Sequence, residues 1–192
     1  DELIYFGTTS GTTNRPKFIP ITLRHWRDYT ASVAPYFVFV ANAFPHIVRG
    51  EAVKMTSPRF EGWTGAGTPY GSPWFIPRML FNTRRDRLTK AMRMLTANRR
   101  VFEEVYNVTD FNAKYYAVLR IALARRISHF SMANPSTVLL ACQKLNELAD
   151  DLIRDVESGH LNKKLPVDPV FGAFVDANLP ADPALAARMR EL

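Results

Sequence analysis

The sequence predicts an α/β domain in which a layered sheet is flanked by helices. Short apolar runs typical of strands alternate along the chain with longer segments whose apolar residues recur at helical spacing. The 192 residues are 47% hydrophobic, which is enough to bury a substantial core. The first strand pattern begins next to the first residue and the last helical pattern runs into the final one. We therefore expect residues 1–192 to form a single domain or a fragment of a larger one.

The chain begins with a pattern of strand, polar loop and strand. Residues 3–6 and 18–21 are short apolar runs, and residues 8–17 between them are rich in threonine and serine. Such a loop of small residues can bind the oxygens of a phosphate chain through its backbone N–H groups and hydroxyls, and a lysine adds a point charge. An ordinary polar turn has a similar composition. Composition alone leaves both interpretations open.

A long helix is expected after the second strand. It begins at Thr22, a typical N-cap, and ends before Phe44-Pro45. Pro35 lies inside this pattern, and proline removes a backbone donor and clashes with the preceding turn. We therefore expect the helix to be kinked or split at this position.

The middle of the chain predicts a strand, a loop and a basic helix. Residues 52–56 resemble a strand, whereas residues 62–77 are rich in glycine and proline and are predicted to form a loop. Residues 84–100 hold most of the formal net charge of +7 and show helical spacing of their apolar residues. A solvated basic face is the simpler interpretation, and an anionic ligand or partner is the alternative.

The C-terminal half predicts three helices and a strand. Asp110 can cap the first helix, residues 127–132 resemble a strand, and residues 134–159 show an N-cap asparagine, an apolar stripe and a final glycine. Cys142 falls on that stripe and is expected in the core. The last helix is expected over residues 182–192, after a stretch with little periodicity.

The loop at residues 8–17 is neither a Walker loop nor a dinucleotide fingerprint, because the required spacing of glycines is absent. Residues 9–17, TSGTTNRPK, instead resemble the first signature of the adenylate-forming enzymes, TSGTTGxPK. Asn14 replaces the second glycine of that signature. Residues 18–20 after the lysine, the glycine-rich residues 65–72 and the order of the later segments resemble the auxin-responsive (Gretchen Hagen) acyl acid amido synthetases.

This resemblance implies that the chain is part of the N-terminal domain of an adenylate-forming enzyme. Such enzymes use ATP with Mg²⁺ to activate a carboxylic acid as an acyl-adenylate, and members of this family then transfer the acyl group to an amino acid. The residues that the resemblance assigns to ATP phosphates are Thr9, Ser10, Gly11, Thr12, Thr13 and, as a helper, Lys17. It places Tyr36 where plant members have an arginine for the substrate carboxylate.

The later adenine-binding segment, the ribose-binding aspartate and the C-terminal catalytic lysine of the superfamily are not found in this sequence, so we assign no catalytic residue and expect these 192 residues to be inactive alone. A coenzyme A ligase of the same superfamily is one alternative function. A basic module that binds nucleic acid or other anions through residues 84–100 is the other.

Other types of site are not supported. The four histidines lack the spacing of metal ligands. The single cysteine cannot form an internal disulfide, and the lack of disulfides suits a cytoplasmic protein. The sequence has no run of about 18 apolar residues, which is the length that a membrane span needs. We therefore expect no metal site in the protein itself, no nucleic-acid partner and no membrane partner.

Overall fold

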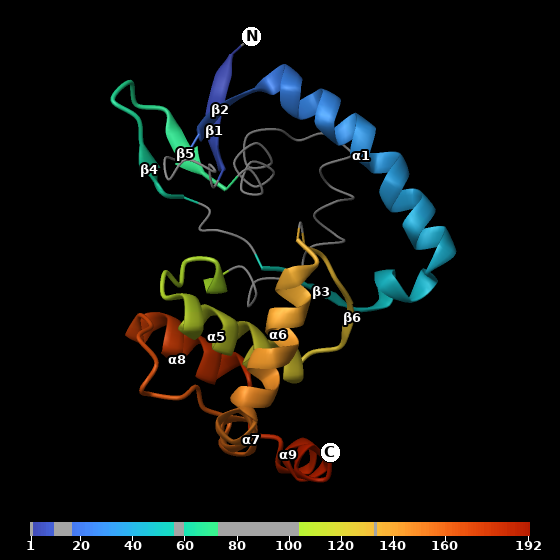
Figure 1. Ribbon diagram of the computed structural model, residues 1–192, viewed down its shortest axis with the longest axis vertical. Helices are drawn as coiled ribbons and strands as arrows, with labels where there is room; N and C mark the ends of the chain where they lie inside the picture. The colour runs from blue at the N-terminus through green and yellow to red at the C-terminus, as the bar shows by residue number, and fades with distance from the viewer. Residues whose placement is uncertain (1, 10–16, 56–59, 73–103, 133) are drawn as a thin grey trace. The chain divides into compact units, whose positions relative to one another are not determined.

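A computed structural model describes residues 2–9, 17–55, 60–72, 104–132 and 134–192. The chain divides into two compact units. The first unit comprises residues 1–48 and 56–97, and the second comprises residues 49–55 and 98–192. Figure 1 shows the helices and strands of both units. The predicted basic helix at residues 84–100 lies outside the described residues.

The first unit is built around an antiparallel pair of strands, β1 (Leu3–Thr9) and β2 (Lys17–Thr22). The register shifts once between Leu3 and Tyr5, and from the Tyr5–Ile21 pair it is constant to the other end, where Thr9 pairs with Lys17. The two predicted strands are thus confirmed, and they are longer than the apolar runs alone indicated, whereas residues 10–16 of the predicted loop lie outside the described residues. The ladder continues into the threonines because β-branched side chains suit an extended backbone.

Two short strands extend this sheet within residues that were predicted to form a loop. They are β4 (Gly62–Trp63) and β5 (Pro69–Gly71), and the strand order is β2-β1-β5-β4. The loop prediction was wrong here because the same glycines and prolines that mark loops also mark the turn and ends of a tight hairpin. Gly67 adopts a positive φ of 77° in that turn, a conformation that favours glycine. Residues 73–77 of the predicted loop lie outside the described residues.

Helix α1 (Leu23–Ala43) follows β2 directly and is followed by the 3₁₀ helix η1 (Pro45–Arg49). Thr22 is the N-cap of α1, and its side chain accepts a hydrogen bond from the backbone N–H of His25 at 3.1 Å. The helix continues through Pro35, so the predicted split does not occur. The first turns of α1 pack on the sheet, where Trp26 contacts the small core formed by Tyr5 and Ile21.

The second unit has a two-stranded parallel sheet and five helices among its described residues. Strand β3 (Glu51–Val53) pairs with β6 (Ile127–Phe130), in agreement with two of the predicted strands. Helix α5 (Phe111–Leu123) is central, because its residues 113–121 are all buried. The predicted cap is confirmed, since the Asp110 carboxylate accepts from the backbone N–H of Ala113 at 2.8 Å.

The single helix predicted over residues 134–159 is two helices, α6 (Ser136–Glu147) and α7 (Ala149–Ser158). Leu148 separates them, with φ −107° and ψ 10°. The apolar stripe read as continuous is therefore interrupted, and the buried face of α6 includes Ala141 instead of its neighbour Cys142. The expectation that Cys142 is a core residue was wrong, because its side chain is exposed. Gly159 ends α7 in the left-handed conformation, as the sequence predicted.

Two further helices complete the second unit. Helix α8 (Pro169–Asn178) was not predicted, although Asp168 caps it through the Val170 N–H and proline occupies its first position. Helix α9 (Pro183–Arg190) agrees with the prediction, and Asp182 caps it in the same way. In Figure 1, α5 lies between α6 and α8 in the second unit. Most buried apolar residues of this unit form one cluster, and Ile153, Val156 and Ala186 form a smaller one between α7 and α9. Among the described residues, no helix is both long and apolar enough to cross a membrane.

Candidate functional site

The candidate phosphate site is the end of the β1–β2 hairpin. Four of its predicted residues lie outside the described residues: Ser10, Gly11, Thr12 and Thr13. The other two are described and are brought together, because Thr9 is the last residue of β1 and Lys17 is the first residue of β2. Their backbones pair with each other at the end of the β1–β2 ladder.

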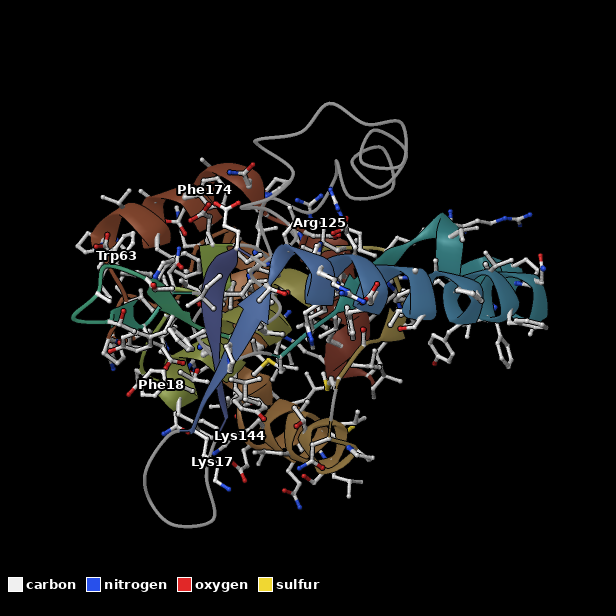
Figure 2. All side chains as sticks on the ribbon, turned by 90° about the horizontal axis from the view of Figure 1, so that it is seen from above. Lys17, Phe18, Trp63, Arg125, Lys144 and Phe174 are labelled. Carbon is white, nitrogen blue, oxygen red and sulfur yellow. The ribbon has the colours of Figure 1, made fainter. Side chains whose placement is uncertain are left out.

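Lys17 is exposed at this end of the hairpin, beside Phe18 (Figure 2). An exposed lysine in an extended backbone keeps its ammonium group available to an anion from solution. Lys17 therefore places a positive charge next to the segment 10–16, whose sequence has three hydroxyl side chains and one glycine. This arrangement suits an anionic ligand such as a phosphate chain.

Three aromatic rings lie next to one another on the sheet near this end. Phe18 of β2 contacts Tyr70 of β5 edge to face, with ring centroids 5.1 Å apart, and contacts Phe6 of β1 with centroids 6.1 Å apart. Phe18 nevertheless remains 47% exposed. These edge-to-face contacts fix the ring orientation and hold the strands together. The exposed ring surface could also stack on a flat apolar ligand.

A polar contact joins β1 to the residue that precedes β4. The hydroxyl of Thr8 donates to the Oε1 atom of Glu61 at 3.1 Å, although the two residues are 53 positions apart in the sequence. Tyr5 also lies on β1 and is buried, with 1% of its surface exposed. Burial raises the pKa of Tyr5 well above its usual value, and the negative charge of Glu61 raises it further. The sequence analysis identified neither Glu61 nor Tyr5.

Tyr36, the predicted substrate-binding residue, lies on α1 and is 63% exposed. Its ring contacts that of Phe37 edge to face, with centroids 5.7 Å apart. The surrounding part of α1 has other exposed apolar residues, including Val38 and Phe39. This surface can accept an apolar group. The phenol can supply a hydrogen bond to a carboxylate but not the positive charge of an arginine.

The second unit contains a buried polar network that the sequence did not indicate. The Tyr116 hydroxyl donates to the Oδ2 atom of Asp155 at 2.8 Å, and the backbone N–H of Asn162 donates to the same oxygen at 2.6 Å. Arg120 is 1% exposed and donates to the backbone carbonyl of Asp155 at 3.0 Å. Burial raises the pKa of Asp155 and lowers that of Arg120. The network connects α5 to α7 and to the turn after it, which is a structural role.

An apolar pocket of about 260 Å³ lies between the β3–β6 sheet and the helices of the second unit. Helices α5 and α6 contribute Leu119, Ala122 and Ala141, and the strands contribute Val53 and Ile127. The pocket can accept an apolar group but offers no charged side chain to a carboxylate. Within the described part of the chain, no group of three histidine, cysteine, aspartate or glutamate side chains could hold a metal ion.

Comparison with known proteins identifies a family. Residues 1–192 match the model of the GH3 family N-terminal domain. A search of the curated proteins finds no significant match. The chain is similar in structure to two solved proteins, described as GH3.15 acyl acid amido synthetase and as AtGH3.15 acyl acid amido synthetase in complex with 2,4-DB.

The structural similarity covers almost the whole chain but only part of each relative. The TM-scores are 0.72 and 0.70, at 15% and 16% sequence identity. The matches cover 100% and 96% of this chain, and 32% and 31% of the two relatives. At this identity the comparison establishes the fold, and it confirms the predicted mixed α/β class. The chain spans about a third of the length of these relatives.

Proposed function

Because the chain belongs to the GH3 family, we propose that it contributes the ATP-binding segment of an acyl acid amido synthetase. The observation that supports this proposal is the paired end of the β1–β2 hairpin. Thr9 and Lys17 lie opposite each other there, and residues 10–16 between them have the sequence of a phosphate-binding loop. The sheet thus fixes the two residues that flank this sequence, and a fixed framework favours binding because less ordering is needed.

The proposed reaction begins with the activation of a carboxylic acid. The acid attacks the α-phosphate of ATP, an acyl-adenylate forms and pyrophosphate leaves. Thr9, Ser10, Gly11, Thr12 and Thr13 would bind phosphate oxygens through hydroxyls and backbone N–H groups, and Lys17 would contribute a positive charge. Mg²⁺ bound to ATP neutralises the phosphates, and it needs few protein ligands because it keeps several waters. Positioning and charge neutralisation are therefore the main contribution of these residues.

The acid would be recognised in part by α1. Tyr36 is exposed on that helix and is surrounded by apolar side chains, so it can contact the body of an apolar acid. A phenol binds a carboxylate more weakly than an arginine does, because it supplies one neutral hydrogen bond. We therefore propose that Tyr36 contacts the acid and that other groups neutralise the negative charge of its carboxylate.

The second step of the proposed reaction is amide formation with an amino acid. The family assignment favours this step over transfer to coenzyme A, which is the alternative within the superfamily. Detection of an acyl-CoA product instead of an amide would support the alternative. Residues 1–192 alone are not expected to complete either step, because they span about a third of the related synthetases.

Acid-dependent exchange of labelled pyrophosphate into ATP tests the first step, measured on the complete gene product that contains this chain. We expect the wild-type protein to catalyse exchange. We expect the double variant Ser10→Ala/Thr12→Ala to abolish it, since two phosphate-binding hydroxyls are lost. Lys17→Ala should raise the KM for ATP about tenfold, because a charge-assisted hydrogen bond contributes roughly 1.5 kcal/mol or more.

Lys163→Ala is the matched control, because Lys163 is also exposed but lies in the second unit. It should leave the KM for ATP unchanged. Wild-type exchange in the Ser10→Ala/Thr12→Ala variant would refute the assignment of the loop. Absence of exchange in the wild-type protein with a broad panel of carboxylic acids would refute the proposed activity.

A further inference from the structure

We propose that Glu61 is a positioning residue for the ATP-binding hairpin: its carboxylate holds Thr8, the residue that precedes Thr9, from the opposite edge of the sheet. This inference rests on the proposed function, since Thr9 is the first residue assigned to phosphate. It assigns a role to a side chain that belongs to neither the loop signature nor the substrate helix.

The backbone of Glu61 is held in the sheet by a hydrogen bond that is separate from the contact between its side chain and β1. Its N–H donates to the carbonyl oxygen of Tyr70 at 2.9 Å, next to the pairing of Gly62 with Tyr70. Glu61 is therefore held at the β4 edge of the sheet, and β5 lies between it and β1. From there its Oε1 atom accepts the Thr8 hydroxyl at 3.1 Å. The contact thus links the outer strand to β1 across the intervening strand.

Glycines pair with each other beside this contact. Gly7 of β1 pairs with Gly71 of β5, and neither residue carries a side chain that would obstruct the glutamate. The influence of Glu61 on Tyr5 is consistent with this placement, because the carboxylate charge is close enough to raise the pKa of the phenol. The glutamate thus lies near β1 at both Tyr5 and Thr8.

The position of Thr8 explains why this contact matters for the hairpin end. The parallel ladder with β5 pairs Phe6 and Gly7, so Thr8 is the next residue beyond it. On its other side Thr8 pairs with Phe18 of β2. The hydroxyl contact with Glu61 supplies a connection on the β5 side at the level where the backbone ladder has ended. It therefore restricts the last residues of β1 immediately before the segment assigned to phosphate.

This role makes a specific prediction for substitutions of Glu61 in the complete gene product. Glu61→Ala should raise the KM for ATP in pyrophosphate exchange about fivefold, which is the effect of losing one hydrogen bond of ordinary strength. The KM for the acid should not change. Glu61→Gln should stay within about twofold of wild type, because the amide oxygen still accepts the Thr8 hydroxyl. Glu191→Ala, which removes an exposed glutamate in the second unit, is the control.

Substitutions of Thr8 test the same contact from the other side. Thr8→Val removes the donor at nearly constant shape and should match Glu61→Ala, whereas Thr8→Ser should behave as wild type. The double variant Thr8→Val/Glu61→Ala should be no worse than either single variant, because both remove one interaction. These conservative variants also keep the test valid if Glu61→Ala fails to fold.

Three results would overturn the inference while leaving the proposed function intact. They are an unchanged KM for ATP in Glu61→Ala, a Glu61→Gln variant as impaired as Glu61→Ala, and additive effects in the double variant. Each of these results is informative only when the wild-type enzyme catalyses acid-dependent exchange. If the wild-type enzyme shows no exchange, the proposed function fails and this inference fails with it.

Discussion

The first unit buries few side chains among its described residues, whereas the second has a continuous apolar core. In the first unit the buried cluster consists of Tyr5 and Ile21, with Ile4 and Trp26 packed against it. In the second unit, α5 is buried along nine consecutive residues and shares one cluster with residues of α6, α7 and α8. The two units therefore differ in what they contribute to the protein. The second unit supplies packing energy, and the first exposes strand ends and a helix surface, where the proposed ligand contacts lie.

The largest expected effect of a substitution therefore lies in the second unit. Leu152 of α7 is fully buried, with 0% of its surface exposed. Leu152→Ala should lower the free energy of unfolding by about 3 kcal/mol, because it removes apolar contacts and leaves a cavity. Chemical denaturation of residues 1–192, followed by circular dichroism, measures this change.

Leu139→Ala is the matched control, because Leu139 is 68% exposed on α6. It should change the free energy of unfolding by less than about 0.5 kcal/mol. Equal effects of the two substitutions would show that the second unit does not have the core described above.

The sequence was more informative about element type than about element length and burial. The predicted caps at Thr22 and Asp110 mark helix starts locally and are both observed. The asparagine cap predicted at residue 134 was wrong by one position, because the N-cap of α6 is Pro135. The break at Leu148 was not predictable in this way, because leucine favours helices and the neighbouring apolar spacing is regular. It depends on how α6 and α7 pack in the second unit, which is information that no local window contains.

The same difference applies to the candidate site, where contiguous residues were predictable and contacts between distant residues were not. The phosphate segment was recognisable because its residues are contiguous in the sequence. Glu61 was not recognisable, since its contact with Thr8 spans 53 positions and depends on the pairing of strands β1, β5 and β4. Arg120 was missed for a related reason: charged residues are seldom buried without partners, and its partner Asp155 lies on another helix.

The buried network predicts a smaller effect, and this effect depends on pH. Burial raises the pKa of Asp155 in the folded protein, so folding favours its protonated form. Its contribution to stability is fully present below the ordinary aspartate pKa of about 4 and is lost as the pH rises through the raised folded-state value. The free energy of unfolding of the wild type, relative to that of Asp155→Asn, should therefore fall as the pH rises from about 3 towards neutrality.

Asparagine is the appropriate substitution because the Tyr116 hydroxyl and the Asn162 N–H both donate to Oδ2 of Asp155. One amide oxygen can accept both bonds, so the variant removes the titration but keeps the network. Asp150→Asn changes an exposed carboxylate on the same helix and is the control. A difference between wild type and Asp155→Asn that rises with pH would contradict the direction given for the Asp155 pKa.

The smallest effect is expected on α1 in the first unit. Phe39 is 75% exposed, so replacing it by alanine removes little packing and introduces a residue with higher helix propensity. Phe39→Ala should therefore change the free energy of unfolding of residues 1–192 by less than about 0.5 kcal/mol. The matched substitution in the second unit, Phe171→Ala, should cost about 3 kcal/mol or more, because Phe171 is only 9% exposed and belongs to the apolar core. A large loss of stability in Phe39→Ala would show that α1 is packed in the isolated chain, and the contrast between the two units would then no longer hold.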